Sequence, residues 1–159
     1  MAIYIYDNLR LVGSILLVDD DQGIRDTLSM VLKGYGHKVR CAASASEALE
    51  ALKQEEYDIL LVDIRLPDKD GIQLLHSIPD RVPAPKAIVI TGYPTLENAV
   101  GAANEGASGY LYKPFEVRQL LEKINALLEQ RMLEKSYDDK KVATYVKSRS
   151  KESAPLIAQ

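Results

Sequence analysis

Short apolar runs alternate with helical patterns along most of the chain. The runs at residues 15–18, 59–62 and 87–90 contain no polar residue, which is typical of strands covered on both faces of a sheet. Residues 109–112 and, with a weaker pattern, residues 37–42 complete a set of five predicted strands. A helical pattern follows each strand in turn.

Residues typical of helix caps stand where several of these helices begin. Ser44 with Glu47 has the spacing of a capping box, and Thr95 precedes another helical pattern. The last helix begins at Glu116 and carries a long apolar stripe. This stripe consists of Val117, Leu120, Leu121, Ile124, Leu127 and Leu128. Strands that alternate with helices in this way predict right-handed crossovers and a parallel sheet in a three-layer α/β sandwich.

Polar residues follow four of the predicted strands at the point where each strand ends. Asp19 and Asp20 follow the first strand, Asp63 the third, Thr91 the fourth and Lys113 the fifth. The carboxyl ends of parallel strands meet at one edge of a sheet, where ligands bind beside the switch in strand order. We therefore expect these side chains to converge, with Asp19 and Asp20 buried.

Three converging carboxylates repel one another and stay ionised only with a cation nearby. Carboxylate oxygens suit a hard cation that keeps open positions, so the sequence predicts a Mg²⁺ site. The Thr91 hydroxyl and the Lys113 ammonium add a hydrogen-bond donor and a positive charge. Because a carboxylate can act as the nucleophile of phosphoryl transfer, the cluster favours a site for a group with several anionic oxygens.

Composition and charge exclude little by themselves. The net charge of −3 indicates neither a nucleic-acid nor a membrane partner, and the chain has no apolar stretch of the roughly 20 residues that would span a bilayer. Cys41 is the only cysteine, so an internal disulfide is excluded and a cytoplasmic protein is expected. Asp7 and Arg10 interrupt the first apolar residues before a signal peptide could form.

The pattern divides the chain into three parts. Residues 1–13 are an N-terminal extension, in which residues 2–6 form either an edge strand or a flexible leader, and residues 14–130 form the domain. Beyond Arg131 the apolar stripe fades and basic residues accumulate. Residues 131–159 are therefore interpreted as a fraying helix followed by a basic, partly disordered tail.

Five motifs in order resemble the receiver domains of two-component response regulators, over about residues 14–130. They are ILLVDDD at 15–21, LVDIRLP at 61–67, DG at 70–71, ITG at 90–92 and GASGYLYKPF at 106–115. A single Asp-Asp pair would be weak evidence, but five motifs at family-like spacing are specific. The resemblance implies a flavodoxin-like (βα)5 fold with the strand order 2-1-3-4-5.

The resemblance also implies a role for each residue of the predicted cluster. Asp63 would accept a phosphoryl group from the phosphohistidine of a sensor kinase or phosphotransfer protein. Asp20, Asp63 and the main-chain carbonyl of Arg65 would bind Mg²⁺, with Asp19 acting through water. Lys113 would pair with Asp63 and then with the phosphoryl group, and its bond to the following proline is typically cis in this family.

The same resemblance implies a switch. Thr91 would move toward the phosphoryl group while Tyr110 moves from an exposed to a buried position behind it. This would change the face formed by the fourth helix, the fifth strand and the fifth helix, where a downstream protein would bind. Arg65 and Tyr93 occupy positions that resemble those tuning dephosphorylation in the family, and because both are large we predict slow self-hydrolysis.

The functional hypothesis is a phosphoacceptor switch that catalyses its own phosphorylation and dephosphorylation and is not otherwise an enzyme. The alternative is a receiver fragment of a DNA-binding regulator, although the 29 residues after Gln130 are too few for a DNA-binding module. In either case this chain itself would not bind nucleic acid, and a homodimer of the phosphorylated form stays open. A dehalogenase-type phosphohydrolase is disfavoured, because it needs a general acid at the position of Arg65.

Overall fold

Five parallel strands form one sheet in the order β2-β1-β3-β4-β5, as predicted. The computed structural model describes residues 11–81 and 83–152. The strands are β1 (Ser14–Val18), β2 (Lys38–Ala42), β3 (Ile59–Asp63), β4 (Lys86–Thr91) and β5 (Gly109–Tyr112). The helices are α2 (Gln22–Gly34), α3 (Ala45–Gln54), α4 (Gly71–His76), α5 (Leu96–Asn104) and α6 (Val117–Glu152).

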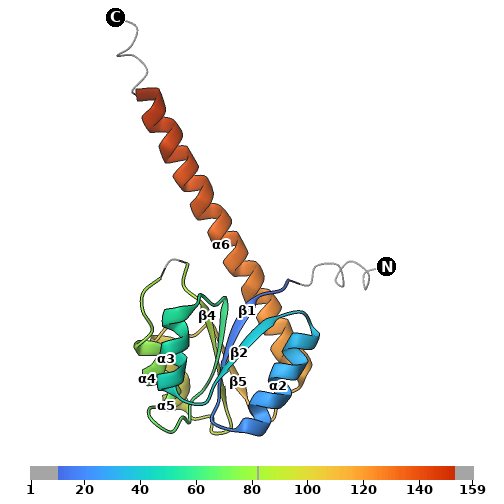
Figure 1. The fold of residues 1–159 in the computed structure, drawn as a ribbon. Coiled ribbons are helices and arrows are strands. Elements are labelled where there is room, and N and C mark those ends of the chain that lie inside the picture. Colours follow the sequence, from blue (N-terminus) through green and yellow to red (C-terminus); the bar gives the residue numbers. More distant parts are fainter. Residues whose placement is uncertain (1–10, 82, 153–159) are drawn as a thin grey trace, which may run out of the picture.

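Helices cover both faces of the sheet (Figure 1). Successive side chains of a strand point to opposite faces, so Leu16 and Val18 pack on one side and Ile15 and Leu17 on the other. The first side holds the buried residues of α3, α4 and α5, and the second those of α2 and α6. This is the predicted three-layer flavodoxin-like sandwich.

The register of the sheet brings the functional strand ends to one edge. Val18 pairs with Val62, Asp63 with Ile90, and Thr91 with Tyr112. Since each of these pairs stands at or beside the end of its strand, the loops that follow β1, β3, β4 and β5 leave the sheet next to one another.

Caps fix where the helices that flank this edge begin. Asp21 accepts from the Ile24 N–H (3.1 Å) at the start of α2, and Thr95 caps α5 as predicted. Ser44 caps α3, but Glu47 accepts from the Ala43 N–H and not from the N–H of Ser44, so the predicted capping box is incomplete.

The complete capping box is at α4, where none was predicted although Asp70 and Gln73 have the required spacing. Asp70 accepts from the Gln73 N–H (2.7 Å), and the Gln73 side chain accepts from the Asp70 N–H (3.2 Å). The sequence offered Gln in place of the more common Glu at the last position. The box fixes the end of the loop that starts at Asp63.

Helix α6 continues without a break to Glu152, far beyond the point where its apolar stripe fades. It leaves the sandwich as a single arm (Figure 1). The disorder expected near the C-terminus falls on residues 153–159, outside the described residues, as does the edge strand or leader expected at 2–6. No helix among residues 11–152 is long and apolar enough to cross a membrane.

Candidate functional site

Three carboxylates meet at the carboxyl edge of the sheet. Oxygens of Asp19, Asp20 and Asp63 all lie within 4.8 Å of one another. Asp19 and Asp63 are buried, at 3% and 8% exposure, because their backbones continue strands that are covered on both faces. Asp20 is exposed, contrary to the expectation of burial, since it lies in the turn that leads from β1 into α2.

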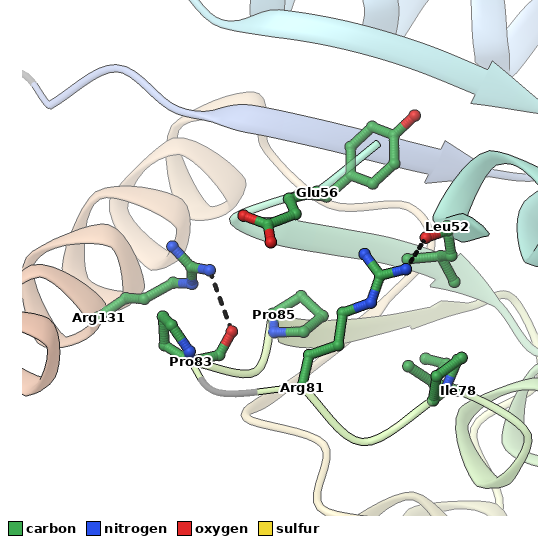
Figure 2. Close-up of a pocket in the computed structure, with 9 residues that line it drawn as sticks. Leu52, Glu56, Ile78, Arg81, Pro83, Pro85 and Arg131 are labelled. Atoms are coloured by element: carbon green, nitrogen blue, oxygen red, sulfur yellow. Dashed lines mark hydrogen bonds between the residues drawn. The ribbon is translucent and has the colours of Figure 1, made fainter. Parts of the chain in front are cut away.

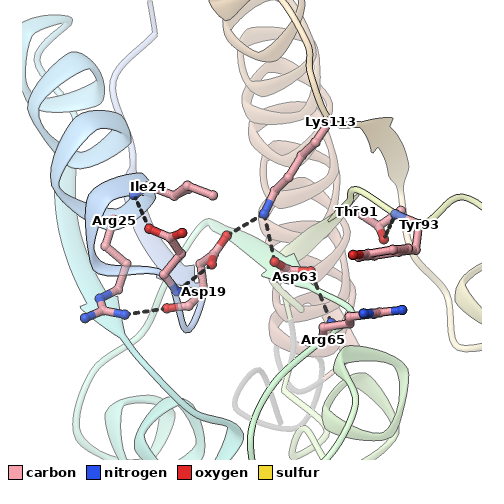
Figure 3. A network of polar contacts seen from close by, with 9 residues as sticks. Asp19, Ile24, Arg25, Asp63, Arg65, Thr91, Tyr93 and Lys113 are labelled. Carbon is pink, nitrogen blue, oxygen red and sulfur yellow. Dashed lines mark hydrogen bonds and ion pairs between the residues drawn. The ribbon is translucent and has the colours of Figure 1, made fainter.

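Lys113 connects two of the carboxylates (Figure 3). Its Nζ donates to Asp19 Oδ2 and to Asp63 Oδ2, both at 2.8 Å. The lysine main chain is held by its N–H, which donates to the Thr91 carbonyl at 2.7 Å, and the Lys113–Pro114 peptide bond is cis. The ammonium therefore reaches the cluster from the end of β5.

Burial and hydrogen bonding shift the pKa values of Asp63 and Lys113 in opposite directions. Burial raises the pKa of the Asp63 carboxyl above its usual value, although hydrogen bonds from Lys113 and from the Arg65 N–H oppose the change. Burial alone would lower the pKa of Lys113, but its hydrogen bonds to Asp19 and Asp63 raise it overall. The lysine is therefore a stable cation that partly compensates the carboxylates.

The donor set fits Mg²⁺. Three ionised carboxylates face one ammonium, so two negative charges remain uncompensated, and all the candidate ligands are oxygens. The Asp21 N–H donates to Asp19 Oδ1 (2.9 Å) and the Arg65 N–H to Asp63 Oδ1 (3.1 Å), which orients both carboxylates. The hydrogen bond from the Arg65 N–H also fixes the Arg65 main chain beside the Asp63 carboxylate.

The two predicted switch residues differ in their hydrogen bonding. Thr91 is fully buried, and its Oγ1 accepts from the Tyr93 N–H at 3.0 Å. Tyr110 packs against the core on the α3–α5 side, and its hydroxyl is buried with no hydrogen-bond partner among the described residues. The Thr91 hydroxyl is thus engaged by its own loop while Tyr110 is already turned inward.

Arg65 and Tyr93 contact each other across the edge of the sheet. The guanidinium carbon lies 3.3 Å from the centroid of the Tyr93 ring, and Figure 3 shows the two groups stacked beside Asp63 and Thr91. The sequence indicated both positions but not their contact. The sequence did place each residue two positions after the end of a strand, Arg65 after β3 and Tyr93 after β4, and these strands are neighbours in the sheet.

A separate pocket lies at the opposite edge of the sheet, where β3 and β4 begin (Figure 2). Its lining includes Leu52 and Tyr57, together with Arg81, which donates to the Leu52 carbonyl, and Arg131, which donates to the Pro83 carbonyl. Since no residue of the acidic cluster lines this pocket, it is not part of the candidate site.

Comparison with known proteins defines the class. A model of the response regulator receiver domain matches residues 15–125, and the chain belongs to this family. A CheY-like receiver domain protein from Methanospirillum hungatei is 40% identical, with a TM-score of 0.74 over 78% of this chain and 99% of that one. The family and the fold therefore agree with the sequence prediction.

Longer proteins also contain a similar domain. A DNA-binding transcriptional regulator NtrC from Proteus hauseri is 39% identical over 118 residues, which cover 74% of this chain and 24% of that protein. The response regulator FleR of Pseudomonas aeruginosa is 38% identical over 70% of this chain and 24% of its own length. NtrX from Brucella abortus has a TM-score of 0.74 and 32% identity, over 81% of this chain and 30% of that one. The chain thus spans about a quarter of the curated relatives it matches.

Proposed function

We propose that this chain is a phosphorylation-controlled switch in which Asp63 accepts a phosphoryl group from a phosphohistidine. The observation that supports this most directly is the position of Lys113, which donates to both Asp19 and Asp63 in a cluster of three carboxylates. A sensor histidine kinase or a histidine phosphotransfer protein would supply the phosphoryl group, in the cytoplasm.

In the proposed reaction an Asp63 carboxylate oxygen attacks phosphorus. The new O–P bond forms as the P–N bond breaks, and the electron pair of that bond leaves with the histidine nitrogen. Lys113 would exchange its contact with Asp63 for one with a phosphoryl oxygen. Asp20, Asp63 and the Arg65 carbonyl, with Asp19 acting through water, would hold Mg²⁺, which would neutralise charge on the phosphoryl oxygens. In a second step, water would attack phosphorus, the Asp63 O–P bond would break and inorganic phosphate would leave, so the domain would also catalyse its own dephosphorylation.

The readout would begin at Thr91. Movement of its hydroxyl toward the phosphoryl group would alter the hydrogen bond that it accepts from the Tyr93 N–H, and with it the loop before α5. The face of α5, β5 and α6 next to this loop exposes several apolar side chains. These are Leu96, Val100, Tyr112 and Val117. Exposed apolar residues on a neighbouring surface support a protein target or a second copy of the chain as the partner.

The curated relatives favour a second candidate, the receiver of a longer transcriptional regulator. NtrC is described as a DNA-binding transcriptional regulator, and this chain covers 24% of it. In that case α6 would connect the switch to an output domain, and the DNA contacts would lie elsewhere in the protein. Both candidates use the same phosphoacceptor.

The proposed function is tested by Mg²⁺-dependent labelling with acetyl phosphate. Wild type should be labelled on Asp63, and Asp63→Asn should show no labelling because the amide is not a nucleophile. Asp21→Asn is the matched control, since it changes a neighbouring carboxylate that caps α2 and lies outside the cluster. Labelling of Asp63→Asn at the wild-type level would contradict the site assignment. Size-exclusion chromatography with and without a phosphoryl mimic would then separate a dimerising from a monomeric output.

A further inference from the structure

Arg65 lies in the loop between β3 and α4 (residues 64–70), and its main chain and side chain contact different parts of the site. The Arg65 main chain borders Asp63 through its N–H, while its side chain stacks on Tyr93 in the loop that leads to α5. Within the loop, the Gly71 N–H donates to the Ile64 carbonyl at 2.7 Å. These hydrogen bonds shape the loop but do not attach it to a neighbouring element.

Asp68 attaches the loop to α3. Its Oδ1 accepts from the Ala45 N–H at 2.9 Å and its Oδ2 from the Ser46 N–H at 2.8 Å. Both donors belong to the first turn of α3, whose apolar face is buried against the sheet. Among the described residues, these are the two hydrogen bonds that join the loop to an element other than its flanking β3 and α4. The loop is therefore fixed to a rigid neighbour at a point three residues after Arg65.

We propose that Asp68 is a positioning residue that holds the main chain of the 64–70 loop against α3, so that the Arg65 carbonyl can serve as a ligand of Mg²⁺. This inference rests on the proposed function. The tether matters because the Arg65 side chain contacts the loop that Thr91 must move during switching. A fixed main chain allows that side chain to leave Tyr93 without displacing the carbonyl.

A purely structural role for Asp68 makes a different prediction. The carboxylate also satisfies two N–H groups at the start of α3, so its removal would destabilise the helix even with no effect on the metal. Ser44 caps the same helix through the Glu47 N–H and does not touch the loop. Ser44→Ala is therefore a matched control, because it weakens α3 and leaves the tether intact.

The experiment measures Mg²⁺ affinity of the full chain directly by calorimetry, together with the melting temperature. Asp68→Ala should raise the Mg²⁺ dissociation constant about tenfold, as expected when support for a metal ligand is lost. Asp68→Asn keeps one acceptor oxygen and should lie between wild type and Asp68→Ala, while Ser44→Ala should lower the melting temperature at unchanged Mg²⁺ affinity. If Asp68→Ala does not fold, the Mg²⁺ affinities of Asp68→Asn and Ser44→Ala are compared instead, and only Asp68→Asn should bind Mg²⁺ more weakly than wild type.

The results separate this inference from the proposed function. Wild-type affinity for Mg²⁺ in every folded Asp68 variant would overturn the positioning role, even when wild type is labelled on Asp63. A weakened affinity in Ser44→Ala equal to that in the Asp68 variants would also overturn it, because general loosening of α3 would then suffice. Absence of labelling in wild type would instead contradict the proposed function itself.

Discussion

Arg65 and Tyr93 stack on each other beside Asp63 and Thr91, at the carboxyl edge of the sheet (Figure 3). If Asp63 is phosphorylated as proposed, we expect these two side chains to hinder the water that hydrolyses the acyl phosphate. Each residue is exposed, but the stacking of the Arg65 guanidinium on the Tyr93 ring restricts the motion of both side chains. Their contact joins the loop after β3 to the loop after β4. Two large side chains held together exclude more space than two that move independently.

Removing either partner should therefore shorten the lifetime of the acyl phosphate. In Arg65→Ala and in Tyr93→Ala we expect hydrolysis to be about threefold to tenfold faster, a barrier lower by about 0.7–1.4 kcal/mol. Because each variant also breaks the stack, the double variant should add little to the single ones. The measurement is the decay of the labelled protein after the phosphodonor has been removed.

Tyr137→Ala serves as the control for this series, because Tyr137 is an exposed aromatic residue on the arm of α6. It should leave the lifetime unchanged. Lifetimes equal to wild type in both single variants would refute the shielding role, and fully additive effects would refute the role of their contact.

His37, between α2 and β2, is buried beside the beginning of β1. Its Nδ1 accepts from the Gly13 N–H at 3.1 Å, so the neutral ring carries its proton on the other nitrogen. Burial lowers the pKa of this imidazole below its ordinary value of 6.5. A proton on Nδ1 would place two donors opposite each other and would charge a buried group.

The stability of the domain should therefore fall in acid partly through His37. Above pH 6.5 the ring is neutral in both the folded and the unfolded chain, so its contribution is complete. Below that pH the unfolded chain binds the proton first, and the free energy of unfolding decreases until the pH reaches the lowered pKa of the folded state. His37→Gln keeps an acceptor and should remove this component.

Urea unfolding of wild type and His37→Gln between pH 5 and pH 8 measures the effect. The difference in their free energies of unfolding should change with pH only below about pH 6.5. The two proteins differ only at residue 37, so the difference isolates His37. A difference that is constant over the whole range would show that His37 does not control stability in acid.

Among the elements, those with strong local signals were predicted well. The continuous apolar runs identified β1, β3 and β4, and the Gly109–Tyr112 strand has the predicted bounds. Cap residues likewise placed the beginnings of α3 and α5. These signals are local because burial on both faces or a single hydrogen bond to a nearby N–H determines them.

Contacts between elements could not be predicted in the same way. The tether from Asp68 to α3 spans 22 or 23 residues of sequence, and the stack of Arg65 on Tyr93 connects two different loops. The periodic pattern of apolar residues describes one helix or strand at a time and does not indicate contacts between residues so far apart in the sequence. The convergence of Asp19, Asp63 and Lys113 was predictable only because the topology of a parallel sheet brings the carboxyl ends of its strands together.

Gly71 illustrates the same limit within one motif. The sequence identified the Asp70-Gly71 pair by resemblance, but the reason for the glycine is a contact with β3. A Cβ at this position would lie 2.2 Å from the Asp63 carbonyl oxygen, which is backbone and cannot rotate away. The glycine therefore lets α4 begin directly against the strand that carries Asp63.

At the scale of the whole molecule, contacts between α6 and the sandwich continue past residue 130. Arg131 donates to the Asp58 side chain and to the carbonyls of Pro83 and Ala84. One turn later Glu134 pairs with Lys86 at 2.9 Å. These contacts connect α6 to the beginnings of β3 and β4, the two strands whose other ends carry Asp63 and Thr91.

The stabilising part of α6 should therefore end near residue 135. A chain that stops after Gln130 should lose about 1.5–3 kcal/mol of unfolding free energy relative to one that stops after Lys135, because Arg131 makes partly buried, charge-assisted hydrogen bonds. The chain that stops after Lys135 should match the full chain within about 0.5 kcal/mol, since residues 136–149 are exposed. Urea unfolding midpoints measure both differences.

Arg131→Ala in the chain that stops after Lys135 identifies the residue responsible. It should reproduce most of the loss seen on stopping after Gln130, whereas Glu134→Ala should cost less, because the Glu134 side chain is 46% exposed and its ion pair is screened by solvent. Equal stability of the chains that stop after Gln130 and Lys135 would place the boundary at 130, as the apolar stripe predicts. A further loss on removing residues 136–159 would instead mean that the arm of α6 contributes to the stability of the domain, through contacts beyond those of Arg131 and Glu134.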